Sequence, residues 1–205
     1  MIKIRPLFIL LNSIIIINVL AILFSVLIQV PSAFHYFTVL SNIFMTVVAT
    51  LSIYVALRRT PSQILNVLYL IATTSLVLVF LVVATFLAPQ FENYFYLFSG
   101  YNFFLHFLNP LLAVIALFLF KEPKFSFKTC FLSLVPPFLY AIIYFIFVIL
   151  RKDWPDFYNF TLGGKDWLSI LTLFIILSVT YFISAILITF CKKLSKQDSE
   201  KQSSI

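Results

Sequence analysis

Six long apolar runs constrain this chain more than any other feature of its sequence. They cover residues 7–30, 37–57, 64–88, 102–120, 129–150 and 167–190. Each is about as long as the 20 helical residues that cross the hydrocarbon core of a bilayer. Because the connections are short, residues 1–191 are predicted to form one all-α, polytopic six-transmembrane-helix bundle. The polar segment 192–205 is predicted to be a disordered cytoplasmic tail.

Composition excludes a soluble domain. The chain is 62% hydrophobic and 10% charged, with a mean hydropathy of +1.10, whereas soluble domains carry roughly 25% charged residues. The first run follows Lys3 and Arg5, as in a signal peptide. Its apolar part is about twice the usual length, however, and no small-residue cleavage site follows. We therefore expect a retained first helix in an integral membrane protein.

The basic residues predict the orientation. If the chain crosses the membrane six times, most of its 14 Lys and Arg residues fall on one side, including Lys3, Arg5, Arg58, Arg59 and the lysines of the last segment. The other side receives Arg151, Lys152 and Lys165. The positive-inside rule then places both termini in the cytoplasm. The net charge of +7 is thus a topology signal and indicates no nucleic-acid partner. Abundant Phe, Ile and Lys with little Gly suggests an AT-rich bacterial genome and hence a bacterial plasma membrane.

Two polar stripes lie at the predicted outer ends of the second and fourth spans. Thr38 and Asn42 are four residues apart, and His35 would join them if the helix extends backwards. Asn102, His106 and Asn109 follow spacings of four and three, so they share one helix face. At about 1.5 Å per residue, Asn42 and His106 lie at similar depth. We expect the two stripes to face each other.

These residues suggest a hydrolytic site. A hydroxyl becomes a useful nucleophile when a neighbouring base takes its proton, and His is the commonest such base. His106 is an ionisable group at membrane depth, which is itself a sign of function. We therefore predict Thr38 and His106 as the catalytic residues. Amides among Asn42, Asn102 and Asn109 are expected to support them, with Asn42 or Asn109 stabilising an oxyanion.

Asp153 and Asp156 in the last outer loop are candidates for a third group that orients His106. The alternative is that both are solvated charges that balance Arg151 and Lys152. The sequence leaves these two interpretations open.

No metal or cofactor is predicted. A metal site would need His35, His106 and a carboxylate in one coordination shell, and their spacing matches no recognised ligand motif. Cys130 and Cys191 are too few for a metal site or a disulfide framework. They are expected to be small apolar fillers.

Two short segments resemble a known family. YFTVLSN (36–42) and HFLNP (106–110) are similar to motifs of the Pr-six-Pr group of six-span membrane proteins, which resembles the androgen-induced, ADTRP-like membrane hydrolases. The resemblance implies a six-helix bundle with cytoplasmic termini and an intramembrane threonine hydrolase. It also implies lipid substrates in the bilayer, notably fatty acid esters of hydroxy fatty acids, with Thr38 as nucleophile and His106 as base.

Two other functions fit the sequence. Pro110 and Pro136-Pro137 would kink two spans, and with the polar stripe they allow a small transporter or channel-like protein. Ion-coupled transport usually needs buried carboxylates, and none of the seven Asp and Glu residues falls within a predicted span. The third hypothesis is a non-enzymatic membrane assembly or stress protein, in which the polar residues only hold helices together.

Overall fold

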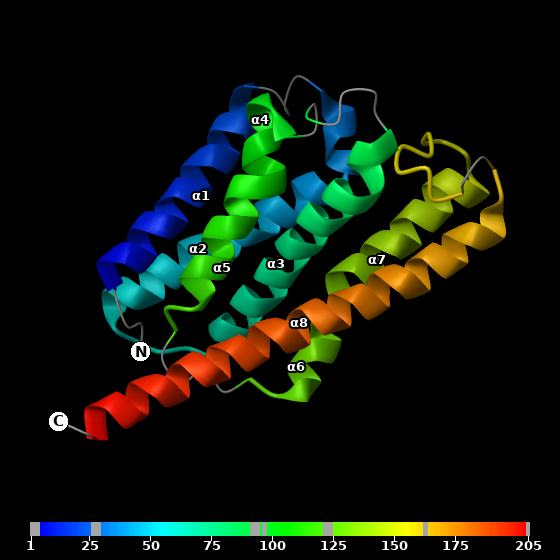
Figure 1. The fold of residues 1–205 in the computed structure, drawn as a ribbon. Coiled ribbons are helices and arrows are strands. Elements are labelled where there is room, and N and C mark those ends of the chain that lie inside the picture. Colours follow the sequence, from blue (N-terminus) through cyan, green and yellow to red (C-terminus); the bar gives the residue numbers. More distant parts are fainter. Residues whose placement is uncertain are drawn as a thin grey trace.

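The protein is an all-α bundle with six helices long and apolar enough to cross a membrane (Figure 1). The computed structural model describes residues 5–25, 30–90, 95, 98–120, 125–161 and 164–203, and it has no strand within these ranges. The spans are Arg5–Ser25, Phe37–Arg58, Gln63–Gln90, Gly100–Leu117, Phe127–Leu150 and Trp167–Gln197. The six predicted spans are confirmed, and the chain is an integral multi-pass membrane protein.

Three of the spans are single helices, namely α1 (Arg5–Ser25), α2 (Phe37–Arg58) and α8 (Asp166–Ser203). A short 3₁₀ turn, η2 (Pro31–His35), precedes α2. The third span is α3 (Gln63–Val82), which continues through the π turn η3 (Val83–Leu87) and η4 (Ala88–Gln90). The fourth consists of α4 (Gly100–Phe103), the π turn η6 (Phe104–Leu108) and α5 (Asn109–Leu117). The fifth consists of α6 (Phe127–Leu132), α7 (Val135–Tyr144) and the π turn η7 (Phe145–Leu150).

Proline explains two of the irregularities. Pro110 has no N–H to continue the helical hydrogen bonds, and the π turn η6 ends two residues before it. Pro136 and Pro137 lie in the first turn of α7, where missing N–H groups cost little, and α6 ends just before them. Both sites were predicted to be kinks, and both are interruptions of an otherwise continuous span.

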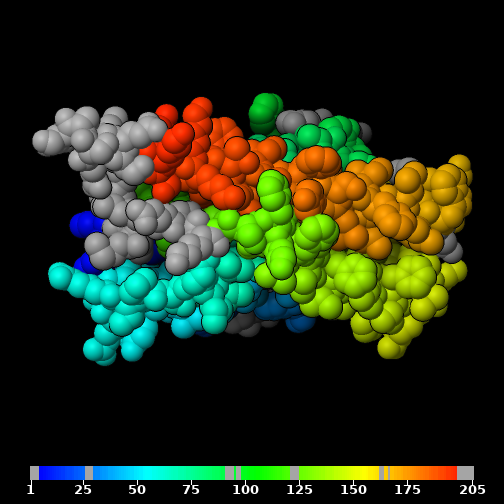
Figure 2. Space-filling model, turned by 90° about the horizontal axis from the view of Figure 1, so that it is seen from below, coloured from blue at the N-terminus to red at the C-terminus, as the bar shows by residue number. Residues whose placement is uncertain are grey.

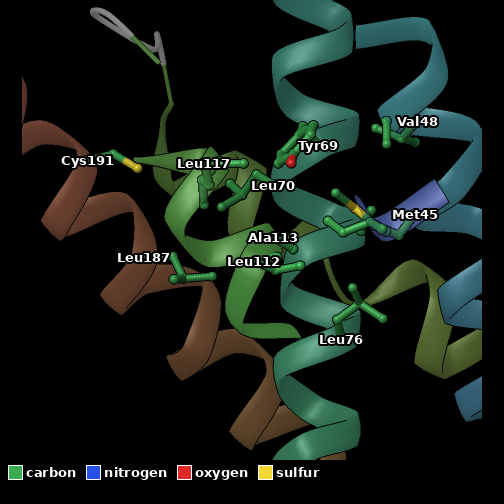
Figure 3. Packing of buried hydrophobic residues seen from close by; sticks show 14 of the residues in the cluster. Met45, Val48, Tyr69, Leu70, Leu76, Leu112, Ala113, Leu117, Leu187 and Cys191 are labelled. Carbon is green, nitrogen blue, oxygen red and sulfur yellow. The ribbon is translucent and has the colours of Figure 1, made fainter. Parts of the chain in front are cut away.

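The main core joins α1, α2, α3 and α5 with the second half of α8. Met45, Tyr69, Leu70 and Leu117 are fully buried there, and Leu187 reaches the same cluster from α8 (Figure 3). Cys130 and Cys191 are buried free thiols in this core, as expected of apolar fillers. A second cluster at the other end of α8 contains Tyr140, Tyr144, Val148, Ile149 and Tyr158.

Burial differs strongly between the spans. In the most apolar stretch of the third span, 61% of the residues are buried, whereas the corresponding share in the sixth span is 22%. Figure 2 shows α8 as a long ridge on the surface, with α6 and α7 beside it. Large apolar side chains on α8, such as Phe174 and Phe182, are about two-thirds exposed at 64% each. The third span is therefore the centre of the bundle, and the sixth presents much of its surface to lipid.

The predicted disordered tail is helical from Lys192 to Ser203, because α8 continues without a break. That segment contains neither Pro nor Gly. Extending an existing helix avoids the cost of nucleation, so polar composition alone does not stop it. Polar composition alone therefore did not predict the conformation of residues 192–203.

The bundle has a basic end and an aromatic end. The basic end is where α1 begins at Arg5 and α2 ends at Arg58, and it is the side predicted to be cytoplasmic. The aromatic end is where α2 begins and where the loop 151–161 packs Trp154, Phe157 and Tyr158 against it.

Candidate active site

A cavity of about 230 Å³ lies near the aromatic end, between α2, the third span, α7, η7 and α8. Most of its wall is apolar, including Leu78, Val82 and Leu173. Its side chains with hydroxyl groups are Thr38, Tyr140, Tyr144, Tyr158 and Ser169. The cavity therefore suits an apolar ligand that carries one polar group.

The cavity opens towards the lipid-facing surface. Ile142, Phe145 and Ile170 line it and are also 43%, 39% and 52% exposed. These residues belong to the fifth and sixth spans, whose outer faces carry other exposed apolar side chains. A hydrophobic molecule in the bilayer can thus approach the cavity sideways, between these two spans.

Thr38 is the buried polar residue that α2 contributes to this wall. It lies in the first turn of α2 and is 8% exposed. Hydroxyls deeper in the helices, such as those of Thr46 and Thr74, donate to the carbonyl four residues earlier. The Thr38 side chain lies close to the hydroxyl of Tyr158 and acts to lower the pKa of that phenol. Its hydroxyl group is therefore at the cavity and beside a second hydroxyl.

Tyr158 is a site residue that the sequence did not reveal. The loop 151–161 folds over the aromatic end, so that the Tyr158 hydroxyl accepts a hydrogen bond of 2.9 Å from the Phe37 amide. Burial raises the pKa of Tyr158 to about 12, although the contacts with Tyr140, Phe37 and Thr38 act in the opposite direction. The phenol is therefore neutral at physiological pH and keeps its hydroxyl hydrogen.

Asn42 and Asn109 belong to a chain of amides that crosses the bundle. The Asn18 amide donates to Asn109 Oδ1 at 3.1 Å, and the Asn109 amide donates to Asn42 Oδ1 at 2.9 Å. Asn42 Nδ2 then donates to the carbonyls of Thr38 at 2.8 Å and Leu105 at 3.2 Å. An amide nitrogen has two hydrogens, so both donors of Asn42 are engaged.

The bond from Asn42 to Leu105 has a cause in the sequence. In the π register of η6, the carbonyl of Leu105 would accept from residue 110, which is proline and has no N–H. Asn42 supplies the missing donor from the neighbouring helix. The Asn42 amide was predicted to stabilise an oxyanion. In the structure it instead donates to the Leu105 carbonyl, which Pro110 leaves without a donor in the fourth span.

His106 is buried, at 7% exposure, within η6. It follows Leu105 in the chain. The Asn42 amide donates to the carbonyls of both Leu105 and Thr38. The cavity wall, as far as the described residues form it, contains Thr38 but neither His106 nor Asn109. The structure thus brings the two helices together next to both residues, and the direct pairing of Thr38 with His106 stays a prediction.

Asn102 lies apart from the amide chain. It is half-buried in α4, and its backbone N–H donates to the Ser99 carbonyl at 3.1 Å. This places it at the start of the fourth span, and a supporting role for it stays a prediction.

The two loop aspartates have different surroundings. Asp153 pairs with Arg151 at 2.6 Å, with both side chains well exposed at 42% and 60%. This is the solvated ion pair of the second interpretation. Asp156 is half-buried and accepts bonds from the amides of Phe160 and Thr161 at 2.9 Å, and from Thr161 Oγ1 at 2.6 Å.

Asp156 also accepts a hydrogen bond from the hydroxyl of Tyr144, which lines the cavity. Burial by itself would raise the pKa of Asp156, but the hydrogen bonds from Thr161, Tyr144 and Phe160 outweigh it and lower that pKa. The carboxylate is therefore ionised at neutral pH. Its contacts fasten the loop 151–161 to α7 and so hold Tyr158 over the cavity.

His35 fixes the segment before α2 to the same loop. Its ring stacks on Trp154 at a centroid distance of 3.9 Å, and Trp154 stacks on Phe147 at 4.6 Å. The His35 carbonyl accepts a 2.7 Å bond from the Tyr140 hydroxyl. Within the described residues, no three His, Cys, Asp or Glu side chains are grouped so that they could hold a metal ion.

Comparison with known proteins finds no match to this chain among family models, curated proteins or solved structures. The similarity to the Pr-six-Pr group therefore rests on the two sequence motifs alone, and the family stays an expectation.

Proposed function

We propose that the protein is a membrane-embedded hydrolase that cleaves an ester bond of an amphiphilic lipid. The observation that carries this proposal is the position of Thr38. Its side chain lies on the wall of an apolar cavity that opens towards lipid. An acyl chain can occupy the apolar part while its ester group lies against Thr38.

We infer the substrate class from the apolar wall of the cavity and from the resemblance to the Pr-six-Pr group. The cavity favours an acyl chain through burial of apolar surface. The hydroxyls of Thr38 and Tyr158 lie near the aromatic end, where the membrane surface and its polar groups are expected. Fatty acid esters of hydroxy fatty acids fit this arrangement. We place the protein in a bacterial plasma membrane, with both termini in the cytoplasm.

The proposed reaction has two steps. Thr38 Oγ1 attacks the ester carbonyl carbon while His106 takes the hydroxyl proton, and the bond to the alcohol breaks as His106 returns the proton to the leaving oxygen. Water then attacks the acyl-threonine with His106 again as base, which releases the fatty acid and regenerates Thr38. The neutral Tyr158 hydroxyl is the group we assign to the oxyanion, because the Asn42 donors are engaged elsewhere.

The experiment is hydrolysis of a fatty acid ester of a hydroxy fatty acid by the full-length protein in nanodiscs. Thr38→Ala and His106→Asn should each lower kcat by about 100-fold or more. Thr38→Ser is the matched control, because it keeps the nucleophilic oxygen, and it should keep measurable activity. Full hydrolysis by Thr38→Ala would overturn the proposal.

A non-enzymatic role is the second candidate, and the amide chain favours it. Asn18, Asn109 and Asn42 are bonded to one another, as expected of polar residues that only join helices. Under this hypothesis Thr38→Ala lowers the stability without abolishing a cellular phenotype. A phenotype lost in Thr38→Ala at unchanged stability would exclude it.

A further inference from the structure

A second, smaller pocket lies at the basic end, far along α2 from Thr38. Its volume is about 50 Å³, and it lies between the start of α1, the end of α2 and the start of α3. One water molecule needs roughly 10–15 Å³, so the pocket has room for several waters or one compact polar group. Its polar wall includes Arg5, Ser52, Arg59, Ser62 and Asn66.

Ser52 is the residue that points to a ligand. Its side chain is 3% exposed, and its hydroxyl has no hydrogen-bond partner among the residues that the structure describes. On the same helix, the hydroxyls of Thr46 and Thr50 donate to the carbonyls four residues earlier, at 2.9 Å and 2.8 Å. A buried hydroxyl in a native protein nearly always has a partner. Ser52 faces a pocket in which a bound group can supply one.

Arg59 is held at the pocket by an unusual backbone conformation. Its φ of 58° lies in the left-handed region, where helix ends normally place Gly. The amides of Arg59 and Thr60 both donate to the Val55 carbonyl, which closes the end of α2. Arg59 therefore occupies a position that the backbone would favour for Gly, and Arg5 of α1 lines the same pocket.

The start of α3 adds positive potential. Ser62 caps this 20-residue helix by accepting a 3.3 Å bond from the Leu65 amide. The amino end of a helix carries a partial positive charge and favours anions. The part of the pocket wall formed by described residues contains no carboxylate. Two guanidiniums, a helix amino end and a donor hydroxyl match the chemistry of a phosphate group.

We propose that this pocket binds a phosphate group, either the headgroup phosphate of an anionic phospholipid in the adjacent leaflet or free inorganic phosphate. Arg5 and Arg59 bind its oxygens, and Ser52 donates the hydrogen bond that it makes to no protein group. The site is separate from the cavity at Thr38, and the proposal does not depend on the proposed hydrolysis.

The test measures the thermal unfolding midpoint of the full-length protein in nanodiscs. One arm uses phosphatidylcholine alone, a second replaces an increasing fraction with phosphatidylglycerol, and a third adds inorganic phosphate to phosphatidylcholine nanodiscs. Binding to the folded state should raise the midpoint in a saturable way. A rise with phosphatidylglycerol alone identifies a lipid site, and a rise with inorganic phosphate identifies a site for the free anion.

The variants distinguish a site from general surface charge. Arg59→Gly removes the guanidinium where glycine suits the backbone, so it should fold and yet need a roughly tenfold higher ligand concentration. Ser52→Ala should weaken binding less. Arg58→Gln is the matched control, because the Arg58 guanidinium lies over the Tyr54 ring, 5.5 Å from its centroid, and outside the pocket.

Two results would overturn the proposal. One is an unchanged midpoint of the wild-type protein with both ligands. The other is an equal loss of response in Arg58→Gln and Arg59→Gly, since that would show attraction by surface charge without a specific site.

Discussion

The two ends of the bundle handle buried polar groups in opposite ways. At the aromatic end, the polar groups around the 230 Å³ cavity are bonded to one another, as in the contacts of Asp156 with Tyr144 and of Asn42 with Leu105. At the basic end, a pocket of 50 Å³ has a partly polar wall, and the Ser52 hydroxyl on that wall has no partner within the described ranges. The first arrangement is a fixed frame for an apolar ligand. In the second arrangement, a charged ligand can provide the hydrogen-bond partner of Ser52.

The largest effect on stability should come from the amide chain. Asn42→Leu leaves the Leu105 carbonyl and the Asn109 amide without their donor and acceptor in a buried place. Leaving two such groups unsatisfied should lower the free energy of unfolding by about 3 kcal/mol. Chemical denaturation in detergent micelles measures this loss. Asn102→Leu is the control and should change stability by less than about 1 kcal/mol; an equal loss in both variants would contradict a specific amide chain.

The loop anchor should give the next largest effect. Asp156→Asn weakens the charge-assisted bonds from Thr161, Tyr144 and Phe160, which should cost about 2 kcal/mol. Asp153→Asn removes only an exposed ion pair and should cost less than about 0.5 kcal/mol. Unfolding of the two variants, measured side by side, compares a fastened carboxylate with a solvated one. Equal stabilities would show that Asp156 does not hold the loop.

The same anchor predicts a dependence on pH. The pKa of Asp156 is lowered in the folded protein, so its contribution is fully present above the unfolded value of about 4 and is lost as the pH falls through the lower folded value. The wild-type protein should therefore lose stability on acidification below about pH 4. Asp156→Asn should lose less over the same range. Parallel pH profiles of the two proteins would contradict this role.

A smaller effect on stability, with a larger effect on activity, is expected for Tyr158→Phe. Removal of the hydroxyl that accepts from the Phe37 amide should cost about 1 kcal/mol of stability. If the hydroxyl stabilises the oxyanion, kcat for ester hydrolysis should fall by roughly 100-fold. Tyr36→Phe is the control, because this ring is 39% exposed, and it should leave kcat unchanged. Equal kcat values in the two variants would remove Tyr158 from the mechanism.

The smallest effect on stability is expected at the basic end and has a different sign. Ser41→Ala removes a 3.0 Å bond to the Thr38 carbonyl and should destabilise the protein by about 1 kcal/mol. Ser52→Ala removes a buried hydroxyl that has no partner among the described residues. Without anionic lipid or inorganic phosphate it should leave stability unchanged or raise it by less than about 1 kcal/mol. Denaturation in phosphatidylcholine nanodiscs, without anionic lipid or added inorganic phosphate, compares the two. Destabilisation by Ser52→Ala under these conditions would show that Ser52 already has a partner.

The sequence was sufficient for the spans because an apolar run of membrane length has few alternatives to a helix. Helical spacing also placed Thr38 and Asn42 on a buried face, and it placed His106 and Asn109 on another. Spacing along one helix, however, does not determine which partner a polar group finds on the next. Asn42 was expected at an oxyanion, and it donates to Leu105 because Pro110 distorts the fourth span.

Other parts of the site depend on tertiary contacts that have no period in the sequence. Asn18 is a single amide within an apolar run, and nothing local marks it as a partner of Asn109. Tyr158 is distant from Thr38 in the sequence and reaches it because Asp156 and Trp154 fasten the loop. The one local signal for Tyr158 was the density of aromatic residues in DWPDFYNF (153–160).

The central claim is that Thr38 is a nucleophile, and trapping of the acyl-enzyme tests it most directly. The wild-type protein is mixed with excess lipid ester, quenched in acid within one turnover and digested, and the peptide containing residues 37–42 is analysed by mass spectrometry. We predict that this peptide gains the mass of the fatty acyl group, that the fragment ions assign it to Thr38, and that it is missing in Thr38→Ala. Continued hydrolysis by Thr38→Ala, or an acyl group on another residue, would contradict the claim.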